Sequence, residues 1–249
     1  MDALERAHVL SHTSYLKWAP GGGAAQAHPV LVAKQLATLA GLAPRRVLPV
    51  FGLKPARPGE LAAFPVPPGR RAAVFDESLT LIRLLLSQEN VTFHGEFFTV
   101  EDASVGPRPG RPLDIWLGGS APGALRRVGR LGDGWLASFL TPDEAGAGRR
   151  AIEAAAAEAG REIEPDHYGI SLAVADDASR PALFEAARRR RPDRDPATLV
   201  ASGWAGARAL VGEYVAAGLT KFVIRPGWTV ADPDQFTGDF VGELVPLQT

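Results

Sequence analysis

The chain has 249 residues, a mass of 26.4 kDa and a formal net charge of −1, with 27 Lys and Arg against 28 Asp and Glu. This length is sufficient for one α/β domain with a substantial core, and we expect a single domain over residues 1–249. The balanced charge excludes a field that would recruit nucleic acid or an anionic membrane surface, so neither partner is expected. Because the sequence contains no cysteine, disulfides, thiolate metal sites and cysteine nucleophiles are excluded.

Residues 1–6 lack the basic and then apolar pattern of a secretory signal. No apolar run approaches the roughly 18 to 20 residues that a bilayer requires. We therefore expect a cytoplasmic protein.

Short β-type runs alternate with helical patterns along the chain, which is typical of parallel βα units. The first predicted strand covers residues 7–16 and is followed by a flexible glycine loop at 21–23. A predicted helix at 29–42 has apolar residues close to a 3.6-residue period. A strand at 47–51 then opens onto the Pro/Gly-rich residues 54–69. That stretch is too long for a tight turn and predicts a lid or an excursion.

A helix at 70–88 precedes an irregular excursion at 91–111, in which His94 and Gly95 predict a hairpin-like turn. We expect the excursion to form a second part of the cover over the active site. The remaining predicted strands are 115–118, 134–137, 168–175 and 221–225. A helix is predicted directly after residue 120, and further helices are predicted at 142–159, 181–190, 205–217 and 233–244.

The strand-to-helix turn after residue 117 is the most informative feature of the sequence. Its apolar run ends at Gly118, Gly119 and Ser120, and a helical pattern begins directly afterwards. The glycines remove the Cβ atoms that keep a phosphate from the backbone, and Ser120 offers a hydroxyl as helix cap or phosphate donor. Free amides and the positive helix end meet there, which predicts a phosphate site. A plain strand-to-helix turn is the alternative.

Residues 91–138 resemble the signature of the luciferase-like flavin-dependent oxidoreductases, which bind FMN or the deazaflavin F420. Residues 28–39 resemble that family's third barrel helix, residues 46–51 its fourth strand and residues 221–226 its eighth strand. The resemblance covers nearly the whole chain, and it implies a TIM-barrel-like (β/α)8 fold of the luciferase-like type.

About six strands are predicted where a closed barrel has eight. In the resembled family, the first two strands precede the region where this chain starts. The expected α/β barrel is therefore incomplete. Because a gap would expose strand edges and core, we expect a homodimer or other oligomer, or a rearranged segment, to cover it.

The resemblance implies a flavin- or F420-dependent oxidoreductase, with FMN or F420 as cofactor. Such a protein transfers hydride to a small organic substrate or uses reduced FMN for monooxygenation. The alternative is a catalytically silent, shortened relative that binds a flavin-like ligand or serves as an assembly subunit.

The resemblance also implies roles for residues near the N-terminus. Ser14 and Tyr15 lie where relatives have a strained, non-proline cis peptide against the flavin, and an ordinary strand with a buried Tyr15 is the alternative. His12 precedes them and is the catalytic candidate for a different reason: the unperturbed pKa of a histidine lies near neutrality, whereas the histidine of the resembled family lies in the missing second strand and cannot be carried over. A structural histidine is its alternative.

Further cofactor contacts are expected at the middle of the chain. Gly118, Gly119 and Ser120 are expected to bind the cofactor phosphate. Asp133, Gly134 and Trp135 resemble the GDGW turn of the family, where Asp133 braces the loop and Trp135 packs in the barrel; a purely architectural role is the alternative.

Two candidates follow on later strands. Ser138 is expected beside the same phosphate. Arg225, at the end of the last strand, resembles the arginine of the family's closing strand. The resemblance implies that it binds an anionic group of the cofactor or substrate bidentately, and a surface salt bridge is the alternative.

Several other features are discounted. The four arginines at 188–191 indicate a solvated helix end rather than a nucleic-acid patch. No metal-ligand spacing surrounds His94, and neither a Gly-x-Ser-x-Gly hydrolase motif nor a Gly-x-Gly-x-x-Gly dinucleotide fingerprint is present.

Overall fold

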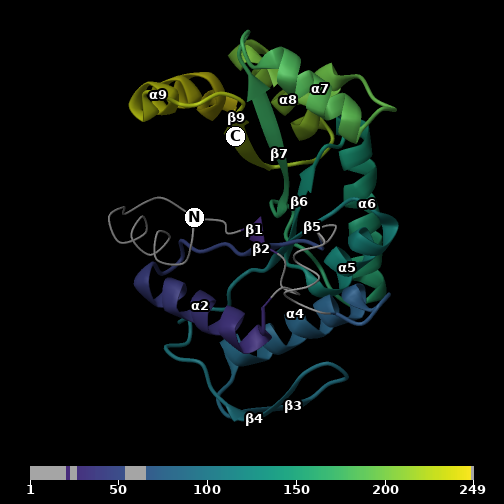
Figure 1. Cartoon of the computed structure of the whole chain (residues 1–249), viewed down its shortest axis with the longest axis vertical. Coiled ribbons are helices and arrows are strands. Elements are labelled where there is room, and N and C mark those ends of the chain that lie inside the picture. The colour runs from purple at the N-terminus through teal and green to yellow at the C-terminus, as the bar shows by residue number, and fades with distance from the viewer. Residues whose placement is uncertain (1–20, 23–26, 54–65, 248–249) are drawn as a thin grey trace. The chain divides into compact units, whose positions relative to one another are not determined.

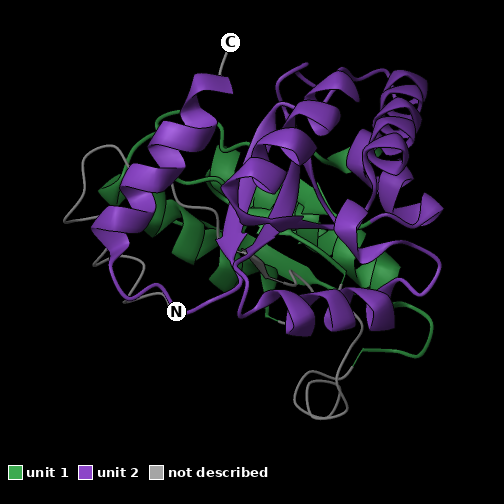
Figure 2. Ribbon diagram, turned by 90° about the horizontal axis from the view of Figure 1, so that it is seen from above, with its two compact units in different colours: residues 1–119, 130–133 green, residues 120–129, 134–249 purple. Residues whose placement is uncertain are grey.

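The computed structural model describes residues 21–22, 27–53 and 66–247 (Figure 1). The chain divides into two compact units, which Figure 2 distinguishes by colour. Unit 1 comprises residues 1–119 and 130–133, and unit 2 comprises residues 120–129 and 134–249. The predicted strand at 7–16 and most of the predicted lid lie outside the described residues.

Unit 1 combines a small parallel sheet, two helices and a hairpin. The sheet strands are β1 (Gly21–Gly22), β2 (Val50–Phe51) and β5 (Trp116–Gly118), with β2 paired to both others. The helices α2 (Pro29–Leu42) and α4 (Arg71–Ser87) pack against each other. The antiparallel hairpin consists of β3 (Val91–His94) and β4 (Thr99–Ala103).

Local sequence explains where α2 begins. Pro29 occupies the first turn, where a missing amide costs nothing, and the His28 side chain accepts a hydrogen bond from the Val30 amide at 3.3 Å. Leu36 lies on the buried face of α2, and Phe75 and Leu79 lie on that of α4. Burial of these apolar faces stabilises the helix pair.

The hairpin is anchored to α4 by one carboxylate. Glu77 accepts hydrogen bonds from the amides of Glu96, Phe97 and Phe98 at 2.9, 2.8 and 2.7 Å. A carboxylate that accepts three amide hydrogen bonds orders the turn between β3 and β4. The predicted turn at His94 and Gly95 is confirmed by this geometry.

Unit 2 holds the larger part of the parallel sheet. Its strands are β6 (Gly134–Ser138), β7 (Tyr168–Ala175), β8 (Val200–Ser202) and β9 (Lys221–Pro226). Its helices are α5 (Pro122–Leu131), α6 (Pro142–Glu158), α7 (Arg180–Arg190), α8 (Gly203–Ala216) and α9 (Pro233–Leu244). The last two residues of α5 belong to unit 1. Short 3-10 turns lie at Pro196–Thr198 and Val245–Leu247.

Strand β7 is the centre of this sheet and is parallel to all of its partners. It pairs with β6 over residues 168–171, with β9 over 169–174 and with β8 over 173–175. Because Ala173 pairs with both β8 and β9, these strands lie on opposite edges of β7, and β8 continues the edge that β6 occupies. Neither unit closes a barrel by itself.

The two faces of β7 have different surroundings. Trp135 and Tyr168 are neighbours in register and face α6: a Cβ built on Gly148 would lie 2.6 Å from the Trp135 ring, and the Arg149 guanidinium lies 4.5 Å from the Tyr168 ring centroid. Side chains alternate between faces along a strand, so Ser171 lies on the face opposite this helix. Ser171 is also the only residue of β7 that is not fully buried.

The predicted α/β fold with a mainly parallel sheet is confirmed, with two corrections. The flexible loop predicted at 21–23 is wrong for Gly21 and Gly22, which pair in parallel with Val50 and Phe51 through their backbones. Strand β8 was not predicted, because three residues after a 3-10 turn are too short to show an alternating pattern. None of the described helices combines the length and apolarity needed to cross a membrane.

Candidate active site

The turn after β5 has the geometry that the sequence predicts. The buried residues Trp116 and Leu117 are followed by half-buried Gly118 and by Gly119 and Ser120, which are exposed. Gly119 has a φ of 112°, a backbone angle that residues other than glycine rarely adopt. The chain thus turns from strand to helix at two exposed residues, Gly119 and Ser120.

The first turn of α5 leaves amides available to a ligand. The carbonyl of Ala121 is the first that the helix uses, accepting from Ala124 and Leu125 at 2.8 and 3.0 Å. The amides of Ser120 and Gly123 therefore have no intrahelical carbonyl, and Pro122 has no amide. These donors and the positive end of the helix dipole suit an anion.

Asp133 braces the start of β5 within unit 1. Its carboxylate accepts from the Ile115 amide at 2.8 Å and from the Arg83 guanidinium at 2.6 Å, and its amide donates to the Ile115 carbonyl at 2.8 Å. Arg83 also donates to the Leu131 carbonyl at 2.8 Å. The sequence allowed Asp133 to brace the loop or to have another architectural role. The contacts with Ile115 and Arg83 favour bracing.

Gly134 and Trp135 begin β6 in unit 2, and both are buried. The Trp135 ring packs against Gly148 of α6, and the Trp135 side chain is fully buried. For these two residues, the geometry favours the architectural alternative.

Ser138 and Arg225 come together through a residue that the sequence analysis missed. Ser138, the last residue of β6, is exposed and lies next to Ser171 in register. Arg225 Nε donates to Ser171 Oγ at 2.7 Å. The only signal for Ser171 in the sequence is a polar residue within an apolar strand, and the pairing with Arg225 spans 54 positions along the chain.

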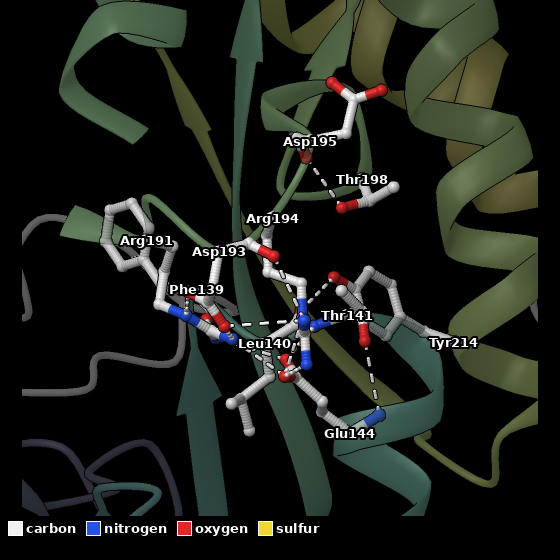
Figure 3. Close-up of polar contacts among 10 residues, drawn as sticks. All are labelled: Phe139, Leu140, Thr141, Glu144, Arg191, Asp193, Arg194, Asp195, Thr198 and Tyr214. Carbon is white, nitrogen blue, oxygen red and sulfur yellow. Dashed lines mark hydrogen bonds and ion pairs between the residues drawn. The ribbon is translucent and has the colours of Figure 1, made fainter. Parts of the chain in front are cut away.

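The loop that follows Ser138 is held at three consecutive backbone positions, as Figure 3 shows. Arg191 donates to the Phe139 carbonyl at 2.8 Å, the Tyr214 hydroxyl donates to the Leu140 carbonyl at 2.6 Å, and Glu144 accepts from the Thr141 amide at 2.9 Å. Phe139 has a φ of 55°, which is uncommon for a residue other than glycine. Such a conformation persists because its surroundings hold it in place.

Ion pairs lock the same loop to the segment after α7. Arg191 binds Glu144 at 2.7 Å and Asp193 at 3.0 Å, and Arg194 binds Glu144 at 2.7 Å. These hydrogen bonds, that of Arg191 foremost, lower the pKa of Glu144 to about 2. Hydrogen bonding by Arg191 likewise lowers the pKa of Asp193 to about 2. Both carboxylates are therefore ionised at neutral pH.

The remaining sequence candidates His12, Ser14 and Tyr15 lie outside the described residues. Gly118, Gly119 and Asp133 belong to unit 1, whereas Ser120, Gly134, Trp135, Ser138 and Arg225 belong to unit 2. Within the described part of the chain, no group of three or more His, Asp or Glu side chains is placed to hold a metal ion.

Comparison with known families gives one match over most of the chain. The model of a family described as luciferase-like monooxygenase matches residues 4–221. The F420-dependent glucose-6-phosphate dehydrogenase of Kineococcus radiotolerans is 28% identical over 251 residues, which cover 88% of this chain and 74% of that protein. An uncharacterised protein of Mycobacterium tuberculosis is 38% identical over 116 residues, 47% of this chain. The match spans only 40% of the length of that mycobacterial relative.

Solved structures share the fold. An F420-dependent secondary alcohol dehydrogenase in complex with an F420-acetone adduct is 17% identical, with a TM-score of 0.80 over 100% of this chain and 84% of the other. The oxygenating constituent of the 3,6-diketocamphane monooxygenase of Pseudomonas putida, in complex with FMN, is 17% identical with a TM-score of 0.79 over 99% and 84%. At these identities the likeness establishes the luciferase-like α/β fold. The two names contain the two cofactors that the sequence predicts.

Proposed function

Since this chain belongs to the luciferase-like monooxygenase family, we propose that it is an oxidoreductase that binds FMN or F420 and acts on a small organic substrate. The observation that carries this proposal is the exposed turn between β5 and α5. It combines a glycine at positive φ with amides that have no partner in the helix. The names of the relatives include both F420 and FMN. They therefore support these two cofactors as the candidates and do not decide between them.

The donor set at the turn fits the phosphate that both cofactors have in their tails. Gly119 presents no Cβ to an approaching oxygen, and Ser120 adds a hydroxyl to the amides of the first turn. An anionic phosphate gains from several short amide hydrogen bonds and from the helix dipole. A neutral ligand would gain far less from the same groups.

When bound, the flavin or deazaflavin ring supplies the hydride chemistry. The chain then has to hold the tail and fix the orientation of the ring. Asp133 and Arg83 keep the start of β5 in place, and the contacts of Arg191 and Tyr214 keep the loop after Ser138 in place. Rigid placement of this kind lowers the entropy cost of binding. His12 stays our prediction for the acid or base.

The proposal is tested by titrating the purified protein with FMN and with F420 and following absorbance and fluorescence. We expect saturable binding of one of the two, a cofactor band retained through gel filtration, and a substrate-dependent change in the oxidation state of the cofactor, seen as loss or return of the absorbance band of its oxidised form. A colourless protein that cannot be reconstituted with either cofactor would contradict the proposal. A protein that binds a cofactor but neither oxidises its reduced form nor reduces its oxidised form would be the silent relative.

A further inference from the structure

The last helix of unit 2, α9, buries little of its surface. Leu244 is its only buried residue, and Val241 is 50% exposed. Among the described elements, α9 packs mainly against α8 and the 3-10 turn that follows it. Helix α8 is of similar length and has four buried residues, Ala207, Leu210, Val211 and Tyr214. Burial of apolar surface therefore stabilises α9 much less than it stabilises α8.

The sequence of α9 also favours a helix only weakly. Gly238 and Gly242 lie in its interior, where glycine is less favourable than alanine. Packing does not require either glycine, because a Cβ at these positions would have no atom within 4 Å. A helix of 12 residues is marginal in water even when its sequence is favourable. Helix α9 therefore depends on its contacts with the rest of unit 2.

An aromatic contact attaches α9 to the rest of the unit. The ring centroid of Phe236 lies 5.5 Å from that of Trp204 and 6.1 Å from that of Trp228. Arg208 of α8 also forms an ion pair with Glu243 of α9. Ion pairs between partly exposed side chains contribute little, whereas aromatic pairs contribute beyond the area that they bury. Phe236 is therefore the main attachment of the first half of α9.

The two tryptophans lie at the carboxyl end of the sheet. Trp204 lies two residues after the end of β8, and Trp228 lies two residues after the end of β9. Both strands are parallel to β7 and end beside its residues 174–175. Parallel α/β folds bind their ligands at this end of the sheet. Helix α9 thus contacts two half-buried indole rings at the end of unit 2 where a ligand is expected.

We propose that α9 is a lid, which opens as one element while the sheet of unit 2 stays folded. Opening separates Phe236 from Trp204 and Trp228 and admits small molecules to both indole rings. An element with little burial and weak helix propensity opens at a lower free energy than the core does. The lid goes beyond the proposed function and does not depend on it, because opening takes place in the protein without a cofactor.

Hydrogen exchange of the full chain, measured by mass spectrometry and corrected for intrinsic rates, detects this opening. In the wild type, the amides of α9 should exchange at least about tenfold faster than those of α6. The double variant Gly238→Ala, Gly242→Ala should slow exchange in α9 about 20-fold, since each interior glycine weakens a helix about fivefold. Gly212→Ala is the matched control: Gly212 is an interior glycine of α8 with equally open surroundings, and its replacement should leave exchange in α9 unchanged.

The variant Phe236→Ala tests the aromatic attachment. It should speed exchange in α9 at least about tenfold. It should also increase the quenching of tryptophan fluorescence by acrylamide, a small neutral probe, because two of the five tryptophans lose their contact with α9. Phe184→Ala is the matched control, a half-buried phenylalanine on α7 that packs against a different cluster, and it should leave exchange in α9 unchanged.

Exchange in α6 serves as the internal reference for the fold of unit 2. Equal exchange of α9 and α6 in the wild type would overturn the lid, because α9 would then open only on global unfolding. Unchanged exchange of α9 in the double alanine variant, or equal acceleration of α9 and α6 in Phe236→Ala, would overturn it as well. A protein that binds neither FMN nor F420 but shows the expected exchange would retain the lid and lose the proposed function.

Discussion

Gly119 is the residue on which the turn between β5 and α5 depends most. Its φ of 112° is strained for any residue with a Cβ. We predict that Gly119→Ala raises the Kd for FMN or F420 at least about tenfold, because the turn shifts and its amides no longer converge on the phosphate. Fluorescence titration measures this change.

Gly160→Ala is the matched control for that substitution. Gly160 also has a positive φ, 65°, at the end of α6, and open space surrounds the position of a Cβ. Both variants should lose about 1 kcal/mol or more of stability through backbone strain. Only Gly119→Ala should lose cofactor affinity, and the same Kd in both variants would refute the role of the turn.

Two buried tyrosines of unit 2 give a second test at the scale of the residue. The Tyr214 hydroxyl donates to the Leu140 carbonyl at 2.6 Å, whereas the Tyr168 hydroxyl has no hydrogen-bond partner among the described residues. Tyr214→Phe should lower the free energy of unfolding by about 1–3 kcal/mol, because it leaves a carbonyl unpaired. Tyr168→Phe should be neutral or stabilising, since burial of an unpaired hydroxyl is unfavourable.

Chemical denaturation of both variants beside the wild type makes this comparison. Burial raises the pKa of Tyr168 to about 12, which is consistent with a hydroxyl that is neutral at every pH used. Equal losses of stability in the two variants would mean that the contact with Leu140 does not hold the loop after β6.

At the scale of the element, the connection from β6 to α6 should make the protein sensitive to acid. The pKa of Glu144 is lowered from 4.5 to about 2, chiefly by its hydrogen bond to Arg191. A carboxyl whose pKa is lower in the folded state contributes stability above its unfolded pKa and loses it as the pH falls through the folded pKa. The contribution of Glu144 should therefore be complete above about pH 5 and fade towards pH 2.

The variant Glu144→Gln tests this pH dependence. At pH 7 it should be less stable than the wild type by about 1–3 kcal/mol, and the difference should shrink as the pH falls below 5. Glu185→Gln is the control, since Glu185 is exposed and its contacts with Arg188 and Arg189 are 3.9 and 3.8 Å. A constant difference between Glu144→Gln and the wild type across this range would exclude the proposed ion pair as its cause.

The secondary structure was predicted well where a long periodic pattern coincided with local start and stop signals. The helix at Pro29–Leu42 and the strand at Tyr168–Ala175 have their predicted bounds, because Pro29 begins the first and a continuous apolar run defines the second. Val200–Ser202 and Gly21–Gly22 were missed, since a strand of two or three residues depends on its partners rather than on its own pattern.

The candidate site was predictable only where it is local in sequence. The turn at Gly118 and Gly119 is contiguous, so its glycines and following helix could be recognised together. Ser171 became a candidate only through the register of β7 with β6 and β9, which no local pattern contains.

At the scale of the whole molecule, alternation of strands and helices was sufficient to predict the α/β class, and the family match over residues 4–221 agrees with the resemblance. A single domain and a homodimer or other oligomer stay predictions. One strand of unit 2, β8, was not predicted. It pairs with the same edge of β7 as β6 does and is not part of a βα unit of ordinary length.

The central claim is that the amides after β5 bind the phosphate of a flavin or deazaflavin, and calorimetry with matched ligand pairs tests it most directly. The pairs are FMN with riboflavin, and F420 with its phosphate-free deazaflavin core. We predict saturable binding of at least one phosphorylated member, with a Kd at least about 30-fold lower than that of its phosphate-free counterpart. Equal affinity within both pairs, or no saturable binding of either phosphorylated cofactor, would contradict the claim.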